Sequence, residues 1–267
     1  MCVALTRFAT VGEMRELGFA TIKRGDGVKL AYDLLPGASP MVVFLPGFAS
    51  DMGGTKAMAL QSLCAARGQA MLRLDYSGHG ASEGEFTEGS IGGWTADAAL
   101  VMAQVCGNEP VILVGSSMGG WIALLLACEL GARVTKMLLV APAPDFTAEL
   151  IEPSLNDAHR EALARDGFFA PPSEYGPPVP ITAKLLADGR NYLLLGGPIR
   201  VACPVRILHG MADPDVPWQQ SLKLIEQLAS QDVQVNFIKD GDHRLSRESD
   251  LYLLRLTLAA LLDEDGT

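Results

Sequence analysis

The chain has 267 residues, of which 49% are hydrophobic and 19% charged, and its formal net charge at pH 7 is −10. This composition is typical of a globular protein with a large apolar core, and it excludes disorder over most of the length. An acidic surface repels phosphate backbones and anionic lipid head groups, so we expect no nucleic-acid partner and no membrane-surface role. No apolar run approaches the roughly 18 residues of a spanning helix, so we expect no integral membrane segment.

Short apolar runs alternate with longer helical patterns, which is typical of βαβ units around a mostly parallel sheet. The Gly25-Asp26-Gly27 turn joins the first two runs, so we expect an antiparallel hairpin at one edge of the sheet. The apolar runs predict eight strands, at residues 19–24, 29–35, 41–45, 70–74, 111–114, 136–140, 205–208 and 233–238. The helical patterns cover residues 54–67, 94–106, 118–130, 217–230 and 247–263.

Repeated prolines interrupt this alternation between residues 141 and 202. We therefore predict a single core domain formed by residues 1–144 and 201–267, with residues 145–200 inserted as a lid. The apolar side chains of the lid could line a pocket or could pack the lid onto the body, and the sequence leaves both open. These side chains are Phe168, Phe169, Tyr175, Ile181, Leu185, Leu186 and Leu193 to Leu195.

The pattern G-x-S-x-G occurs twice, and its surroundings distinguish the two copies. The first, Gly80 to Gly84, lies in a polar, Gly-rich stretch with no strand before it, so Ser82 is expected to be a loop residue. The second, Gly115 to Gly119, follows an apolar strand and opens a helical run, which is the setting of a nucleophile elbow. A strained turn would hold Ser117 above the sheet edge, where the helix N-terminus favours developing negative charge. We predict that Ser117 is the nucleophile.

A serine hydroxyl needs a neighbouring base, and in this fold the acid and the histidine follow the serine in that order. Of the four histidines, His243 alone completes the order, in a Gly-containing loop between the last strand and the last helix. Asp213 follows a strand end and is predicted to orient the imidazole and to stabilise its charged form. Asp215 and Asp145 remain alternatives for the acid.

Acyl transfer also needs hydrogen-bond donors aimed at the tetrahedral oxyanion. The backbone N–H of Met118, the residue after the nucleophile, is predicted to supply one of them. The second is expected from the loop after the strand at 41–45, where we predict the N–H of Phe48. His209 and Asp75 are expected instead to anchor loops through local hydrogen bonds.

With these residues in place, the chain resembles the serine hydrolases of the α/β-hydrolase superfamily. Within that superfamily it resembles the mitochondrial palmitoyl-protein thioesterases that also act as acyl-glucuronide esterases. The resemblance spans residues 30–262 and rests on more than the elbow. The motifs that carry it are Pro46-Gly47-Phe48, Gly53-Gly54-Thr55-Lys56-Ala57, Asp75-Tyr76-Ser77-Gly78, Gly115-Ser116-Ser117-Met118-Gly119-Gly120-Trp121, His209-Gly210-Met211, Val216-Pro217-Trp218 and Asp242-His243-Arg244.

The resemblance implies an α/β-hydrolase fold with a mostly parallel eight-stranded sheet, and a hydrolase of carboxylic esters or thioesters that forms an acyl-enzyme. The substrate would be a small-molecule ester or thioester, or an acylated protein. Water is the only other reactant, so no cofactor and no metal ion are expected. Two alternatives stay open: an acyltransferase or carbon–carbon bond hydrolase that uses the same site, and a ligand-binding protein on the same fold. A monomer and a homodimer are both compatible with the sequence.

The five cysteines are odd in number and widely spaced, and most lie in apolar segments. They are interpreted as reduced core residues of a cytoplasm-like compartment. No CxxC or HExxH spacing occurs, which agrees with the expectation of no structural zinc. The N-terminal sequence has no apolar region typical of a secretory signal. We therefore predict a cytoplasmic location and leave a mitochondrial address open.

Overall fold

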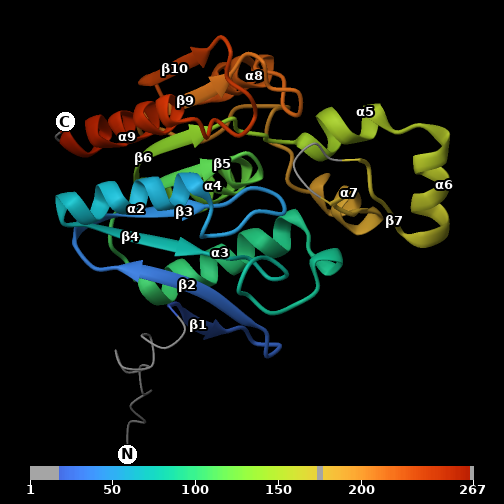
Figure 1. Ribbon diagram of the computed structural model, residues 1–267, viewed down its shortest axis with the longest axis horizontal. Helices are drawn as coiled ribbons and strands as arrows, with labels where there is room; N and C mark the ends of the chain where they lie inside the picture. The colour runs from blue at the N-terminus through green and yellow to red at the C-terminus, as the bar shows by residue number, and fades with distance from the viewer. Residues whose placement is uncertain (1–17, 173–176, 265–267) are drawn as a thin grey trace, which may run out of the picture.

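The computed structural model describes residues 18–172 and 177–264, which form an eight-stranded sheet with helices on both faces (Figure 1). The strand order is β1-β2-β4-β3-β5-β6-β9-β10; β1 pairs antiparallel with β2 and β2 with β4, and all other neighbours are parallel. The predicted fold class is confirmed, including the antiparallel hairpin at the edge. The strands are β1 (Ala20–Lys23), β2 (Lys29–Leu35), β3 (Ala38–Leu45), β4 (Gln69–Leu74), β5 (Val111–Ser116), β6 (Val134–Val140), β9 (Val205–Gly210) and β10 (Val233–Ile238).

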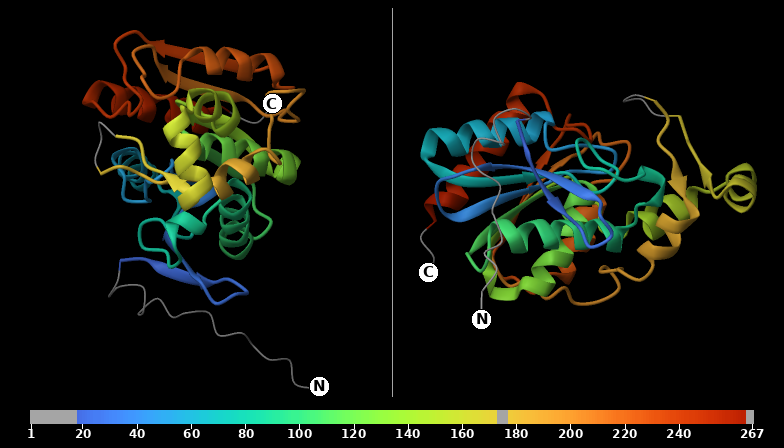
Figure 2. Two further views of the ribbon diagram at one scale, coloured as in Figure 1. Left: turned by 90° about the vertical axis from the view of Figure 1, so that its right-hand side faces the viewer. Right: turned by 90° about the horizontal axis from the view of Figure 1, so that it is seen from below.

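Two layers of helices cover the sheet, with α2 and α9 on one face and α3, α4 and α8 on the other (Figure 2). Successive side chains of a strand point to opposite faces. In β3, Val42 and Phe44 pack with α2 and α9, whereas Val43 and Leu45 pack with α3 and α4. Because both faces are buried, β3 and β5 contain continuous apolar runs, which is why the sequence shows them clearly. The helices are α2 (Thr55–Arg67), α3 (Ile91–Val105), α4 (Met118–Leu130), α8 (Gln219–Gln227) and α9 (Glu248–Asp263).

The predicted helix boundaries differ from the structure at α8, which spans Gln219–Gln227 rather than 217–230, and at α3, which begins at Ile91 rather than at residue 94. Ser90 caps this helix, because its hydroxyl accepts a hydrogen bond from the Gly93 N–H. Gly92 and Gly93 have low helix propensity and obscured the first turn in the sequence. No helix among the residues that the structure describes is long and apolar enough to cross a bilayer.

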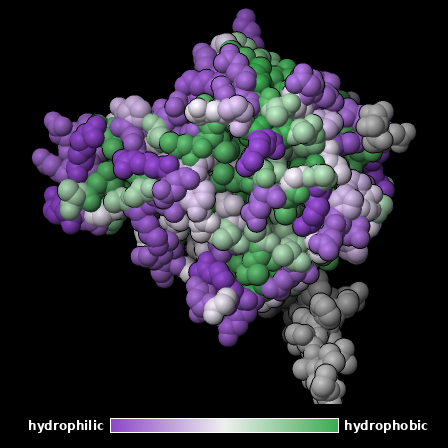
Figure 3. Space-filling model, turned by 180° about the vertical axis from the view of Figure 1, so that it is seen from behind, coloured by the Kyte–Doolittle hydropathy of each residue, from purple (hydrophilic) through white to green (hydrophobic). Residues whose placement is uncertain are grey.

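The segment inserted between β6 and β9 projects from one end of the sheet, and apolar side chains lie among polar ones along it and beside the body (Figure 3). It contains helices that the sequence patterns did not reveal. Helix α6 buries none of its residues, and Leu163 is its one large apolar side chain, so its sequence shows no apolar face. The elements of the segment are a π-helical turn (Thr147–Ile151), α5 (Glu152–Ser154), α6 (Asp157–Asp166), β7 (Phe168–Phe169), β8 (Ile181–Thr182) and α7 (Ala183–Gly189); two short 3-10 turns lie elsewhere, at Phe86–Glu88 and Gly131–Arg133.

Most of the apolar side chains that could have lined a pocket pack the inserted segment instead. Leu185 belongs to the core beneath α3 and α4, and Phe169 and Leu186 form a small separate cluster with Ile181. Ile181 also lines a cavity beside Ser117. Tyr175 lies outside the described residues.

Candidate active site

Ser117 occupies the sharp turn between β5 and α4, with φ +55° and ψ −121°. For a residue other than glycine, a positive φ raises the conformational free energy of the backbone by an amount on the order of 1–3 kcal/mol. The neighbouring glycines make the turn possible: a Cβ on Gly115 would collide with the Gly119 carbonyl oxygen, and a Cβ on Gly119 would collide with the Leu45 carbonyl oxygen. The close approach of three backbone segments therefore explains why glycine stands two positions before and after the serine.

We expect Gly119→Ala to destabilise the protein by about 1–3 kcal/mol or more, because the added methyl group meets rigid backbone. Urea unfolding would measure this loss. Gly196→Ala is the matched control, since a Cβ there meets no atom within 4 Å and the residue does not have positive φ. Its stability should change by only about 0.5 kcal/mol. Equal losses in the two variants would show that crowding at the turn is not the cause.

His243 lies between Ser117 and Asp213, in the loop that joins β10 to α9. Its Nε2 is 3.0 Å from Ser117 Oγ, and its Nδ1 is 2.7 Å from Asp213 Oδ2. The Asp213 side chain is fully buried, and that of His243 is 17% exposed. The structure thus brings together the three residues that the sequence singled out. In this arrangement the imidazole can accept the serine proton while the carboxylate holds the ring in the required tautomer.

Several hydrogen bonds converge on the Asp213 carboxylate. It accepts the backbone N–H groups of Asp215 and Val216 at 2.9 and 2.8 Å, and it lies 3.4 Å from Nε2 of His209. Burial opposes ionisation of this carboxyl, but the hydrogen bonds from His209, His243 and Val216 outweigh it and hold the pKa of Asp213 well below its usual value. Asp213 is therefore an anion at neutral pH, ready to stabilise an imidazolium.

The two alternative acids lie in other environments. Asp215 is exposed, and its backbone N–H supports Asp213. Asp145 is buried at the root of the inserted segment, where its carboxylate accepts the N–H groups of Leu194 and Leu195. Of the three candidates, Asp213 is the one whose carboxylate is hydrogen-bonded to His243.

The residues predicted to anchor loops do so. His209 is fully buried and its Nδ1 lies 2.7 Å from Ser221 Oγ. The carboxylate of Asp75 accepts the Met52 N–H at 2.6 Å. Ser82, from the first G-x-S-x-G copy, lies in a turn and donates its hydroxyl hydrogen to the Asp75 carbonyl oxygen at 2.7 Å. It is a loop residue, as predicted.

Two backbone N–H groups next to Ser117 are available to a ligand. Gly47 approaches the serine so closely that a Cβ on it would lie 3.3 Å from Ser117 Cβ, and Phe48 follows in the same loop. Within residues 18–172 and 177–264 we find no acceptor for the Phe48 N–H. Met118 is the first residue of α4, where backbone N–H groups have no acceptor inside the helix.

Two cavities meet at Ser117 and His243. The larger, about 580 Å³, is mostly apolar and lies beside the inserted segment. The smaller, about 260 Å³, is polar and lies between the loop after β3, the start of α2 and the loop after β10. In the smaller cavity Lys56 Nζ donates to the Arg244 carbonyl oxygen at 2.6 Å, and burial, reinforced by the Arg244 charge, lowers the pKa of Lys56 to about 8. Residues lining the larger cavity include Phe146, Leu150, Ile151, Pro172, Val179 and Ile181.

The described residues contain one group of side chains close enough together to hold a metal ion. Ligand atoms of Asp213, Asp215 and His243 all lie within 4.8 Å of one another. Both ring nitrogens of His243 are already hydrogen-bonded, to Asp213 and to Ser117. We therefore interpret this group as part of the serine site.

Comparison with known proteins agrees with this fold. Residues 42–252 match the sequence model of the alpha/beta hydrolase family. The chain belongs to this family.

Particular relatives lie within the same family. The chain is 36% identical over 248 residues to the mitochondrial palmitoyl-protein thioesterase ABHD10 of mouse, covering 92% of this chain and 83% of the relative. The solved structure of mouse alpha/beta hydrolase domain-containing protein 10 has a TM-score of 0.83 at 35% identity, covering 92% of this chain and 98% of that one. A crystal structure of a candidate hydrolase from Agrobacterium vitis S4 has a TM-score of 0.87 at 46% identity, with the same coverage. The resemblance predicted from the motifs is confirmed.

Proposed function

We propose that the chain is a serine hydrolase of carboxylic esters or thioesters, with Ser117 as nucleophile, His243 as base and Asp213 as the acid. The observation that carries this proposal is the pair of hydrogen bonds from His243, 3.0 Å to Ser117 and 2.7 Å to Asp213. The relatives named palmitoyl-protein thioesterase support acyl substrates, either an acylated protein or a small-molecule ester or thioester. The same relatives are named as mitochondrial, which supports the mitochondrial address over the predicted cytoplasmic one.

The proposed reaction has two halves. Ser117 Oγ attacks the acyl carbonyl while Nε2 of His243 takes the serine proton, and Asp213 stabilises the resulting imidazolium. The N–H groups of Phe48 and Met118 hold the oxyanion, and collapse of the tetrahedral intermediate expels an alkoxide or thiolate that takes the proton from His243. Water, activated by the same imidazole, then hydrolyses the acyl-enzyme and restores the serine.

The linings of the two cavities support an assignment of the parts of the substrate. The larger cavity joins Ser117 to apolar side chains of the inserted segment, so it suits the acyl chain. The smaller, polar cavity, which Ser117 also lines, suits the leaving group. In this proposal residues 145–200 form a lid over the acyl chain, and each buried methylene contributes about 0.8 kcal/mol of binding free energy.

We expect kcat/KM to rise with acyl length across matched oxygen esters and thioesters, by roughly three- to fourfold per methylene until the larger cavity is filled. Long-chain thioesters should be the best substrates. Purified protein assayed against both series measures this, with Ser117→Ala as the blank. A preference for short or bulky oxygen esters would contradict the assignment of the larger cavity to a long acyl chain.

A variant with a narrower cavity tests the same assignment of the acyl chain. Val179 lines the larger cavity, so Val179→Trp should reduce kcat/KM for a long-chain thioester by about tenfold or more and leave short-chain substrates unchanged. Leu193 lies in the same inserted segment, is 46% exposed and does not line the cavity. Leu193→Trp should therefore leave the length profile unaltered.

A further inference from the structure

The loop after β3, which carries Phe48, is held by the loop after β4. Three hydrogen bonds join the two loops, and one of them is made by the residue directly after Phe48. They run from Tyr76 Oη to the Pro46 carbonyl oxygen at 3.2 Å, from the Ala49 N–H to His79 Nε2 at 3.3 Å, and from the Met52 N–H to Asp75 Oδ1 at 2.6 Å.

Ala49 needs this support, because its φ of +52° lies in the left-handed region that favours glycine. An alanine held there returns toward negative φ when its contacts are lost, since the strain is released. The Phe48 N–H is only one peptide unit away. A rotation at Ala49 would therefore move the predicted oxyanion donor relative to Ser117.

The hydrogen-bond partners of His79 determine which of its ring nitrogens accepts the Ala49 N–H. His79 is 3% exposed, and its Nδ1 lies 3.2 Å from the Ser77 carbonyl oxygen. A carbonyl oxygen can only accept, so Nδ1 carries the proton and Nε2 offers its lone pair to Ala49. Burial lowers the pKa of the His79 imidazole, which favours this neutral form.

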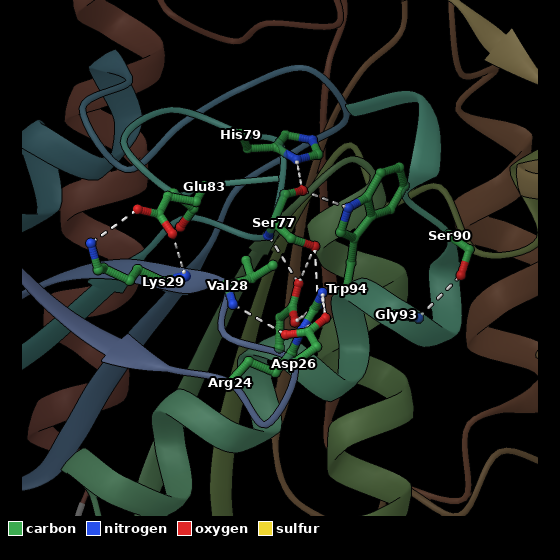
Figure 4. A network of polar contacts seen from close by, with 12 residues as sticks. Arg24, Asp26, Val28, Lys29, Ser77, His79, Glu83, Ser90, Gly93 and Trp94 are labelled. Atoms are coloured by element: carbon green, nitrogen blue, oxygen red, sulfur yellow. Dashed lines mark hydrogen bonds and ion pairs between the residues drawn. The ribbon is translucent and has the colours of Figure 1, made fainter. Parts of the chain in front are cut away.

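A buried network fixes the position of the ring, as Figure 4 shows for His79, Ser77 and Trp94. The Trp94 indole N–H donates to the same Ser77 carbonyl oxygen at 3.1 Å, and its ring lies edge-on to His79 with centroids 5.0 Å apart. The N–H and hydroxyl of Ser77 both donate to Asp97, at 2.9 and 2.6 Å. Asp97 is fully buried and pairs with Arg24 at 2.7 Å. These contacts hold the Nδ1 side of the His79 ring, and Nε2 faces Ala49 in the loop after β3.

We propose that His79 is a positioning residue for the reaction: by accepting the Ala49 N–H, its neutral imidazole keeps the Phe48 N–H directed at the acyl oxygen. This inference rests on the proposed hydrolase function. His79 touches no reacting atom and acts through the Ala49 peptide. Its loss should therefore weaken stabilisation of the tetrahedral intermediate and leave substrate binding unchanged.

Three variants of His79 separate this role from packing. His79→Phe keeps the ring and its contacts with Phe86 and Trp94 but removes the acceptor. His79→Asn can still donate to Ser77 but does not reach Ala49, whereas the longer His79→Gln places a carbonyl oxygen near the position of Nε2. We expect kcat to fall about 10- to 100-fold in the Phe and Asn variants with KM unchanged, somewhat less than the loss of a whole oxyanion donor. The Gln variant should recover most of the activity.

The second readout is the affinity for an alkyl boronic acid, which forms a tetrahedral adduct with the serine and should weaken by the same factor as kcat. Thermal unfolding tests the fold of each variant, and the Asn and Gln pair decides the question if the Phe variant does not fold. Wild-type kcat in the Asn variant, or a rise in KM at constant kcat, would overturn the inference. Failure of the proposed function would be seen in the wild-type protein, which would show neither turnover nor reaction of Ser117 with a fluorophosphonate. In that case both the proposed function and the role of His79 would be wrong.

Discussion

Ser117→Ala is expected to lower kcat for esters and thioesters by about 10⁶-fold, the scale on which triad hydrolases depend on their serine. The serine hydroxyl is the nucleophile that His243 contacts, and alanine offers no atom to attack the acyl carbon. The fold should persist, because alanine tolerates the positive φ of the elbow about as well as serine does. Turnover of a thioester, measured beside thermal unfolding, separates lost chemistry from lost structure.

The other G-x-S-x-G serine provides the control. The Ser82 hydroxyl accepts the Ala31 N–H and donates to the Asp75 carbonyl oxygen, so Ser82→Ala should cost about 1–3 kcal/mol of stability. Its reaction with a fluorophosphonate should nevertheless continue, whereas Ser117→Ala should not react. Wild-type turnover in Ser117→Ala, or labelling lost in Ser82→Ala alone, would sink the assignment of the nucleophile.

The sheet could be predicted because its central strands are buried on both faces and are therefore rich in apolar residues. Helices that pack on the sheet, such as α2 and α9, could be predicted because one of their faces carries buried apolar residues. Helix α6 could not, since it packs no buried face against the body. An apolar pattern in the sequence indicates a buried face, so a helix without buried residues is hard to predict from the sequence.

The elbow and the order of Ser117, Asp213 and His243 could be predicted because each follows a strand at the same edge of the sheet. Which of two carboxylates in one loop faces the histidine could not, because Asp213 and Asp215 differ only in loop geometry. His79 was passed over for a related reason. A histidine between two glycines shows no sign of which distant loop it will contact, and only the fold brings it to Ala49.

Asp213→Asn is expected to lower kcat by about 10⁴-fold at neutral pH. The asparagine amide would donate to Nδ1 of His243 where the carboxylate accepts from it, so the proton would move to Nε2. That nitrogen could then no longer take the proton of Ser117. Asp215→Asn is the matched control, since Asp215 lies in the same loop while both ring nitrogens of His243 are hydrogen-bonded to Asp213 and Ser117. Its kcat should stay within a few-fold of the wild type.

Stability provides an independent check on the same pair of variants. The pKa of Asp213 is held below its unfolded value, about 3.9, so ionised Asp213 stabilises the folded state above that pH and the contribution is lost as pH falls toward the folded-state pKa. Urea unfolding should therefore show Asp213→Asn to be less stable than the wild type at pH 7, with the gap narrowing in acid. A deficit in stability that stayed constant with pH would mean that asparagine disturbs the packing and that the lost charge is not the cause.

A larger loss of kcat in Asp215→Asn than in Asp213→Asn would transfer the acid role to Asp215, since only the residue that is hydrogen-bonded to His243 should control its tautomer.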